Sequence, residues 1–169
     1  YYADNASIFC GDCREIMPSL PAPHMIFADI PYGEVNRESG GLRDLDKGDA
    51  DDPTFSLEWV TQQKADSHYI FCGTEQVSQL RKGFVDQGLA TRLCIWEKTN
   101  PSPLNGEWLW LSSIECCVFA RSQNAFFSLR HASPVWHGKT EQHAQHPTQK
   151  PEWLLRKLIC ASCPEGGLV

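Results

Sequence analysis

The sequence predicts an α/β fold in a single domain that spans residues 1–169. Short apolar runs bounded by turn residues alternate along the chain with segments whose apolar residues recur at helical spacing. A length of 169 residues fits one domain with a sizeable core. The content of 41% hydrophobic and 21% charged residues is typical of a soluble globular protein, and no apolar run reaches the length of a membrane span.

The N-terminal part of the chain predicts a strand–helix–strand unit. We expect a strand over residues 7–10, then a short helix over about 13–20 with Asp12 as its N-cap. The apolar run 25–27 predicts a second strand that ends near Asp29. A crossover of this kind joins parallel strands.

Residues 33–53 predict a mobile loop rather than a regular element. They contain several glycines, and the stretch from Asp44 to Asp52 holds five aspartates against one lysine. A solvated surface loop is the simpler interpretation. A lid that orders over substrate is the functional alternative, since such lids come from segments of low stability.

The rest of the chain continues the alternation. Apolar positions at helical spacing predict a helix that Thr74 caps, that reaches about Gln87 and that Gly88 ends. Gly166 and Gly167 predict a turn that enters a new strand. The other expected elements are helices over about 53–65 and 152–161, and strands over 67–72, 93–96 and 113–120.

The eight cysteines and the net charge do not by themselves exclude any class of function. The pairs Cys10/Cys13 and Cys160/Cys163 have C-x-x-C spacing and could bind zinc, but they lie far apart, so we expect no metal site. Without an export signal, reduced thiols in the cytoplasm are the simplest account. The formal net charge of −6 gives no support to DNA binding, although much of the acid lies in 44–52.

The stretch Asp29-Ile30-Pro31-Tyr32 is the main candidate for a functional site. It follows a predicted strand, and α/β sheets bind ligands at the carboxyl ends of their strands. Asp29 can accept a hydrogen bond from an amino group, and Pro31 fixes the direction of the Ile30 carbonyl. Tyr32 offers a flat face for stacking. Together these groups suit a planar base that carries an amino group.

Glu115 is a second candidate, because it interrupts the apolar run 114–120. A buried carboxylate is costly unless it is paired. Two interpretations remain open: a solvent-facing residue at a strand end, or a member of the active site.

Four motifs resemble those of the amino-group DNA methyltransferases, which modify adenine N6 or cytosine N4. D-I-P-Y at 29–32 resembles their D-P-P-Y. Three other stretches match in the same order and extend the resemblance over nearly the whole chain. They are Gly11-Asp12-Cys13, Trp96-Glu97-Lys98-Thr99-Asn100 (W-x-K-x-N) and His146-Pro147-Thr148-Gln149-Lys150-Pro151 (H-P-T-Q-K-P).

The resemblance implies a Rossmann-like S-adenosylmethionine-dependent methyltransferase fold, with a mainly parallel sheet and helices on both faces. It implies methyl transfer from S-adenosylmethionine to adenine N6 in DNA, with cytosine N4 as the alternative. The implied catalytic residues are Asp29, Ile30, Pro31 and Tyr32. The implied cofactor-binding residues are Asp12, Cys13, His146, Thr148, Gln149 and Lys150.

The resemblance also assigns target recognition to the basic and aromatic interval 121–145. The expected DNA contacts are Arg121, Arg130, Trp136 and Lys139. A homodimer and a restriction-modification partner are further expectations. The rival hypotheses are a DNA-binding relative without catalysis and a small zinc-stabilised domain.

The family's glycine-rich cofactor turn is expected directly after the G-G-x-V strand. The sequence ends at Val169, before such a turn. We therefore expect a fold that is incomplete at its C-terminus and a fragment that need not be active alone.

Overall fold

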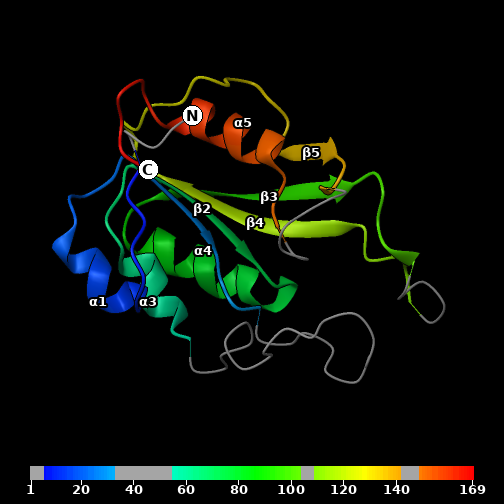
Figure 1. The fold of residues 1–169 in the computed structure, drawn as a ribbon, viewed down its shortest axis with the longest axis horizontal. Helices are drawn as coiled ribbons and strands as arrows, with labels where there is room; N and C mark the ends of the chain where they lie inside the picture. The colour runs from blue at the N-terminus through cyan, green and yellow to red at the C-terminus, as the bar shows by residue number, and fades with distance from the viewer. Residues whose placement is uncertain (1–5, 33–54, 104–108, 142–148) are drawn as a thin grey trace.

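A five-stranded mixed sheet forms the centre of the computed structural model, which describes residues 6–32, 55–103, 109–141 and 149–169 (Figure 1). The strand order is β1-β2-β4-β3-β5. β1 is parallel to β2 and β5 is parallel to β3, while β4 runs antiparallel to both β2 and β3. The α/β class is confirmed, but the sheet is mixed rather than mainly parallel. The strands are β1 (Met25–Asp29), β2 (Ser67–Cys72), β3 (Ala90–Lys98), β4 (Ile114–Arg121) and β5 (Val135–Gly138).

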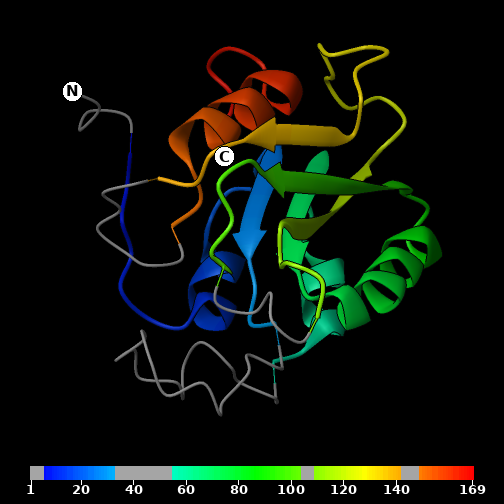
Figure 2. The same ribbon diagram turned by 90° about the vertical axis from the view of Figure 1, so that its right-hand side faces the viewer.

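Helices cover both faces of the sheet, as the resemblance implied (Figures 1 and 2). α5 (Glu152–Ser162) packs on one face, and α3 (Leu57–Gln62) and α4 (Val77–Asp86) pack on the other. All six residues of β2 are buried, and they alternate between the two cores. This pattern belongs to a strand that is covered on both faces, so the sheet has a hydrophobic core on each side.

Local signals place several helix ends correctly. Asp12 caps α1 (Cys13–Ile16), because its carboxylate accepts a hydrogen bond from the Arg14 amide at 2.8 Å. Gly88, at φ +79°, ends α4 as expected. Thr74 is not the cap of its helix. It lies inside the 3₁₀ turn η3 (Thr74–Gln76), which Gly73 precedes, and its hydroxyl donates to Glu75.

The strand expected over residues 7–10 is wrong. These residues are exposed and form no strand in the described part of the chain. An apolar run becomes a strand only when a neighbour supplies hydrogen bonds, and that neighbour lies outside the local pattern. The parallel crossover that does exist runs from β1 through α3 to β2. The loop expected over 33–53 lies outside the described residues.

The last part of the chain returns to the start of the sheet. The backbone amides of His24 and Met25 donate to the Leu168 carbonyl at 2.9 and 3.3 Å. The Leu168 amide donates to His24 Nδ1 at 3.1 Å. Residues near the expected new strand therefore lie beside the beginning of β1. Within the described residues, no helix has the length and apolar character needed to cross a membrane.

Candidate active site

The Asp29–Tyr32 turn lies at the carboxyl end of β1 and is anchored from the core. The Ile30 amide donates to the Phe71 carbonyl at 3.3 Å, which continues the pairing of β1 with β2. The Ile30 side chain is 5% exposed and packs with Ile70 and Leu80. The backbone on either side of Ile30 is thereby fixed relative to the sheet.

Two donors hold the carboxylate of Asp29. The Tyr32 hydroxyl donates to Oδ1 at 3.0 Å, and Lys150 Nζ donates to Oδ2 at 2.6 Å. A carboxylate offers about four lone-pair sites, so this group retains acceptor capacity. The Asp29 side chain is 37% exposed. It is therefore both oriented and open to a ligand.

Glu115 belongs to the same cluster and does not face solvent. Its side chain is 17% exposed, and its oxygens lie 2.7 Å from Lys98 Nζ and 3.1 Å from Lys150 Nζ. Burial raises the pKa of Glu115, but the two ammonium groups outweigh burial and hold this pKa below its ordinary value. Of the two interpretations left open by the sequence, the solvent-facing one is wrong, and Glu115 lies in the cluster around Asp29.

Tyr32 lies between the two carboxylates. Its hydroxyl is 3.4 Å from Glu115 Oε2 and 3.0 Å from Asp29 Oδ1, and its single hydrogen favours the shorter contact. Burial, followed by the charges of Glu115 and Asp29, raises the pKa of Tyr32. The residue is a neutral phenol that donates a hydrogen bond at physiological pH.

Lys150 lies against the carboxylate of Asp29, whereas the resemblance placed it on the cofactor side. Its side chain is 8% exposed, and its ammonium contacts both Asp29 and Glu115. The ammonium also lies 5.7 Å from the centre of the Tyr32 ring and 5.3 Å from that of Phe71. Two of the three ammonium hydrogens of Lys150 can therefore be used within this cluster.

Gln76, in the η3 turn after β2, holds the Asp29–Tyr32 turn in place. Sequence patterns did not indicate this residue. Its side-chain nitrogen donates to the Pro31 carbonyl at 2.8 Å, and its side-chain oxygen accepts from the Gly73 amide at 2.9 Å. A Cβ atom on Gly73 would lie 3.0 Å from the Tyr32 carbonyl oxygen. The loops after β1 and β2 are thus in close contact, and a small residue at position 73 permits it.

The W-x-K-x-N motif connects β3 to β5 and to the cluster. Trp96 Nε1 donates to the Gly138 carbonyl at 3.2 Å. The Asn100 side chain accepts from the Thr140 amide at 2.8 Å and donates to the Thr140 hydroxyl at 3.1 Å. Lys98, between these anchors, reaches Glu115.

Known proteins resemble the chain over most of its length. The Type II methyltransferase M2.DpnII of Streptococcus pneumoniae is 29% identical over 182 residues, which cover 86% of this chain and 67% of the relative. The Type II methyltransferase M2.LlaDCHI of Lactococcus lactis subsp. cremoris is 25% identical, covering 100% of this chain and 77% of the relative. The Type II methyltransferase M2.MboI of Moraxella bovis is 26% identical, covering 98% and 74%.

These similarities support the assignment of the chain to the amino-methyltransferases. No protein-family model matches it. The fold of the methyltransferase is similar to the crystal structure of the M1.HpyAVI–SAM complex, with a TM-score of 0.60 and 18% identity over 88% of this chain and 69% of that one. A second M1.HpyAVI crystal structure gives a TM-score of 0.58 and 15% identity over 89% and 69%. At these identities the similarity shows the fold.

The expected cofactor residues of the methyltransferase are only partly described. Asp12 and Cys13 lie at the exposed start of α1, where the Asp12 carboxylate is bound by Arg14. Gln149 is exposed next to Lys150. His146 and Thr148 lie outside the described residues. The polar groups of Asp12 and Gln149 fit a polar ligand, whereas the ammonium of Lys150 is paired with Asp29 and Glu115.

The four residues expected to contact DNA lie in different environments in the structure. Trp136 is 5% exposed and packs in the core with Tyr69 and Phe71, because β5 is a strand of the central sheet. The Arg121 guanidinium donates to backbone carbonyls, including that of Ala125 at 2.6 Å. Arg130 and Lys139 are exposed.

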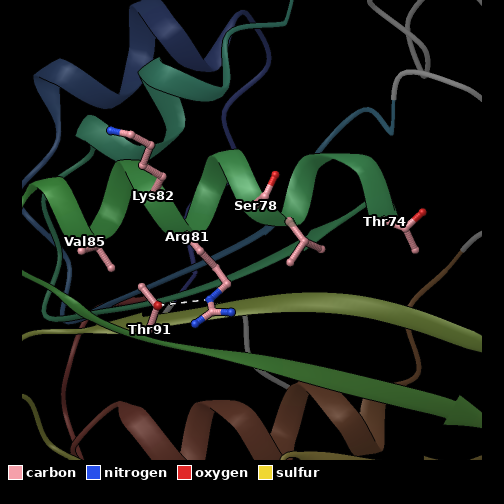
Figure 3. Close-up of a pocket in the computed structure, with 7 residues that line it drawn as sticks. Thr74, Ser78, Arg81, Lys82, Val85 and Thr91 are labelled. Carbon is pink, nitrogen blue, oxygen red and sulfur yellow. Dashed lines mark hydrogen bonds between the residues drawn. The ribbon is translucent and has the colours of Figure 1, made fainter.

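Away from the Asp29 cluster, a metal-binding group or a pocket would be a further candidate site. The described residues contain no group of three or more His, Cys, Asp or Glu side chains that could hold a metal ion. Figure 3 shows an open hollow over α4, where Arg81 Nε donates to the Thr91 hydroxyl at 3.3 Å. Its lining residues include no member of the Asp29 cluster; they are Thr74, Val77, Ser78, Arg81, Lys82, Val85 and Thr91.

Proposed function

We propose that this protein transfers a methyl group from S-adenosylmethionine to the N6 amino group of adenine in DNA. The observation that carries the proposal is the Asp29 carboxylate, which is fixed at the carboxyl end of β1 by Tyr32 and Lys150 and remains partly exposed. The relatives that the chain resembles over most of its length are Type II methyltransferases. The base must leave the duplex to reach this carboxylate.

S-adenosylmethionine, when bound, would supply its sulfonium methyl group to the amino nitrogen and would leave as a neutral thioether. Asp29 accepts one hydrogen of the amino group, and the Ile30 carbonyl accepts the other. Pro31 keeps the backbone of this turn rigid. The nitrogen loses one proton, which passes to water beside the exposed edge of Asp29. Orientation and electrostatics thus provide most of the rate enhancement.

Tyr32 stacks on the flipped base while its hydroxyl holds Asp29 Oδ1. We assign the cofactor side to Asp12, Cys13 and Gln149, together with His146 and Thr148. The exposed Gln149 and the half-buried carboxylate of Asp12 support this assignment as polar groups. Lys150 is assigned to Asp29 instead.

DNA contact is assigned to the exposed Arg130 and Lys139, whose charges can pair with phosphates. We propose a restriction-modification partner on the basis of the relatives, whose names are those of Type II methyltransferases. A homodimer is part of the same proposal.

The test is an assay of the full-length protein with mixed-sequence DNA and S-adenosylmethionine. The DNA is digested to nucleosides, and methylated species are identified by mass spectrometry. N6-methyladenine is the expected product. N4-methylcytosine would move the target to cytosine and keep the mechanism. DNA binding without any methylated nucleoside would contradict the proposal and favour a binding protein without catalysis.

A further inference from the structure

Four charged side chains of alternating sign form one continuous chain at the site. Lys98 contacts Glu115 at 2.7 Å, Glu115 contacts Lys150 at 3.1 Å, and Lys150 contacts Asp29 at 2.6 Å. The four residues come from β3, β4, the segment before α5, and β1. These contacts connect the W-x-K-x-N and H-P-T-Q-K-P motifs, which are far apart in the sequence, to the carboxylate of Asp29.

Burial along this chain is uneven. Lys150 is the most buried member at 8% exposed, and Asp29 is the most exposed at 37%. A buried ammonium is costly unless anions surround it. Glu115 supplies a second anion, so Lys150 stays in place whether or not Asp29 is engaged with a ligand. Lys98 in turn balances the charge of Glu115.

The contact geometry gives Lys150 a specific effect on Asp29. Lys150 holds Oδ2 and Tyr32 holds Oδ1, so the rotation of the carboxylate about its terminal bond is fixed by donors on both sides. Tyr32 must also accommodate the base, so it cannot fix the carboxylate alone. Lys150 makes no such contact in the proposed mechanism.

We propose that Lys150, held in place by Glu115 and Lys98, is a positioning residue that orients the Asp29 carboxylate toward the target amino group. The inference rests on the proposed methyl transfer, because it assigns Lys150 to the same site. It differs from a cofactor role for Lys150 and from a purely structural role. Each of these three roles predicts a different kinetic result.

Single-turnover methylation by the full-length Lys150→Met variant tests the inference. We expect the rate of methyl transfer to fall about 10- to 100-fold, because a misplaced group of this kind costs up to about two orders of magnitude. The KM for S-adenosylmethionine should stay within about twofold of wild type. Lys150→Arg should recover part of the rate, because it restores a cation beside Asp29.

The matched control is Lys82→Met, which removes an exposed lysine that pairs with Asp86 on α4. Its rate should equal that of wild type. Glu115→Gln is a second route to the same result if Lys150→Met folds poorly. It leaves Lys150 in place but weakens its anchor, and a fall in rate of about threefold or more is expected.

Coupling to Asp29 separates positioning from a structural role. In an Asp29→Asn background, the further change Lys150→Met should lower the residual rate by less than about threefold, since the group being oriented is already altered. Fully additive losses, a raised KM for S-adenosylmethionine alone, or a wild-type rate in Lys150→Met would each overturn the inference. Absence of methylation by the wild-type protein would instead contradict the proposed function itself.

Discussion

The side chain of Ile30 belongs to the hydrophobic core, and its backbone belongs to the Asp29–Tyr32 turn. Its side chain is buried beneath the turn, while its backbone lies between Asp29 and Pro31. The family motif has a proline at this place, and isoleucine keeps the carbonyl while it adds an apolar anchor. The rigidity lost with the proline ring is thus offset by packing.

Substitution of this anchor should loosen the turn and destabilise the protein. We expect Ile30→Ala to lower the free energy of unfolding by about 2–5 kcal/mol, and Ile30→Val by about 0.5–1.5 kcal/mol, because each deletes buried methyl groups. Urea unfolding of the variants measures both values. Equal stabilities for the two variants would contradict the burial of this side chain in the core.

At the scale of elements, the position of β4 in the sheet brings Glu115 into the charged cluster around Asp29. It runs antiparallel between β2 and β3, and its register places Glu115 opposite Trp96. Glu115 therefore lies beside Lys98, two residues further along β3, at the same edge of the sheet as Asp29. A charged residue in an apolar strand was the one sequence signal for this arrangement.

The paired Glu115 should make the protein sensitive to acid. Its pKa is lower in the folded protein than its ordinary value of 4.5, so its carboxylate contributes stability above that pH. This contribution is lost as the pH falls below 4.5 through the pKa of the folded state. Wild type should therefore exceed Glu115→Gln in stability at pH 7, and the difference should shrink between about pH 5 and pH 3.

Denaturant unfolding of the two proteins across this pH range measures the difference directly. Both carry the other acidic residues, so their titration cancels in the comparison. A stability difference that stays constant with pH would show that the ion pairs of Glu115 do not stabilise the folded state.

At the scale of the whole molecule, sequence patterns predicted the elements that depend on interactions between residues close in the sequence. β1, β2, α4 and α5 were predicted because hydrophobic periodicity, caps and terminal glycines are all local. The direction of β4 was not predictable in this way, because it depends on how the chain returns to the sheet. Residues 7–10 have the apolar character of a strand but no partner among the described residues.

The site shows the same division between local and distant information. The turn that presents Asp29 could be predicted from Pro31 and the preceding apolar run. Its contact with Lys150, 121 positions away, follows only from the topology of the sheet. Composition marked Trp136 and Arg121 as aromatic and basic, but burial and backbone contacts give both of them structural roles.

The measurement that tests the account most directly is the methylation rate of Asp29→Ala in the full-length protein, followed by transfer of a labelled methyl group to DNA. Asp29 is partly exposed, so its loss should leave the thermal unfolding transition close to that of wild type. The account predicts a fall in rate of about 100-fold or more, comparable to the loss of a principal hydrogen-bonding group in other active sites. A folded variant with near-normal turnover would contradict the assignment of Asp29 as the residue that receives the target amino group.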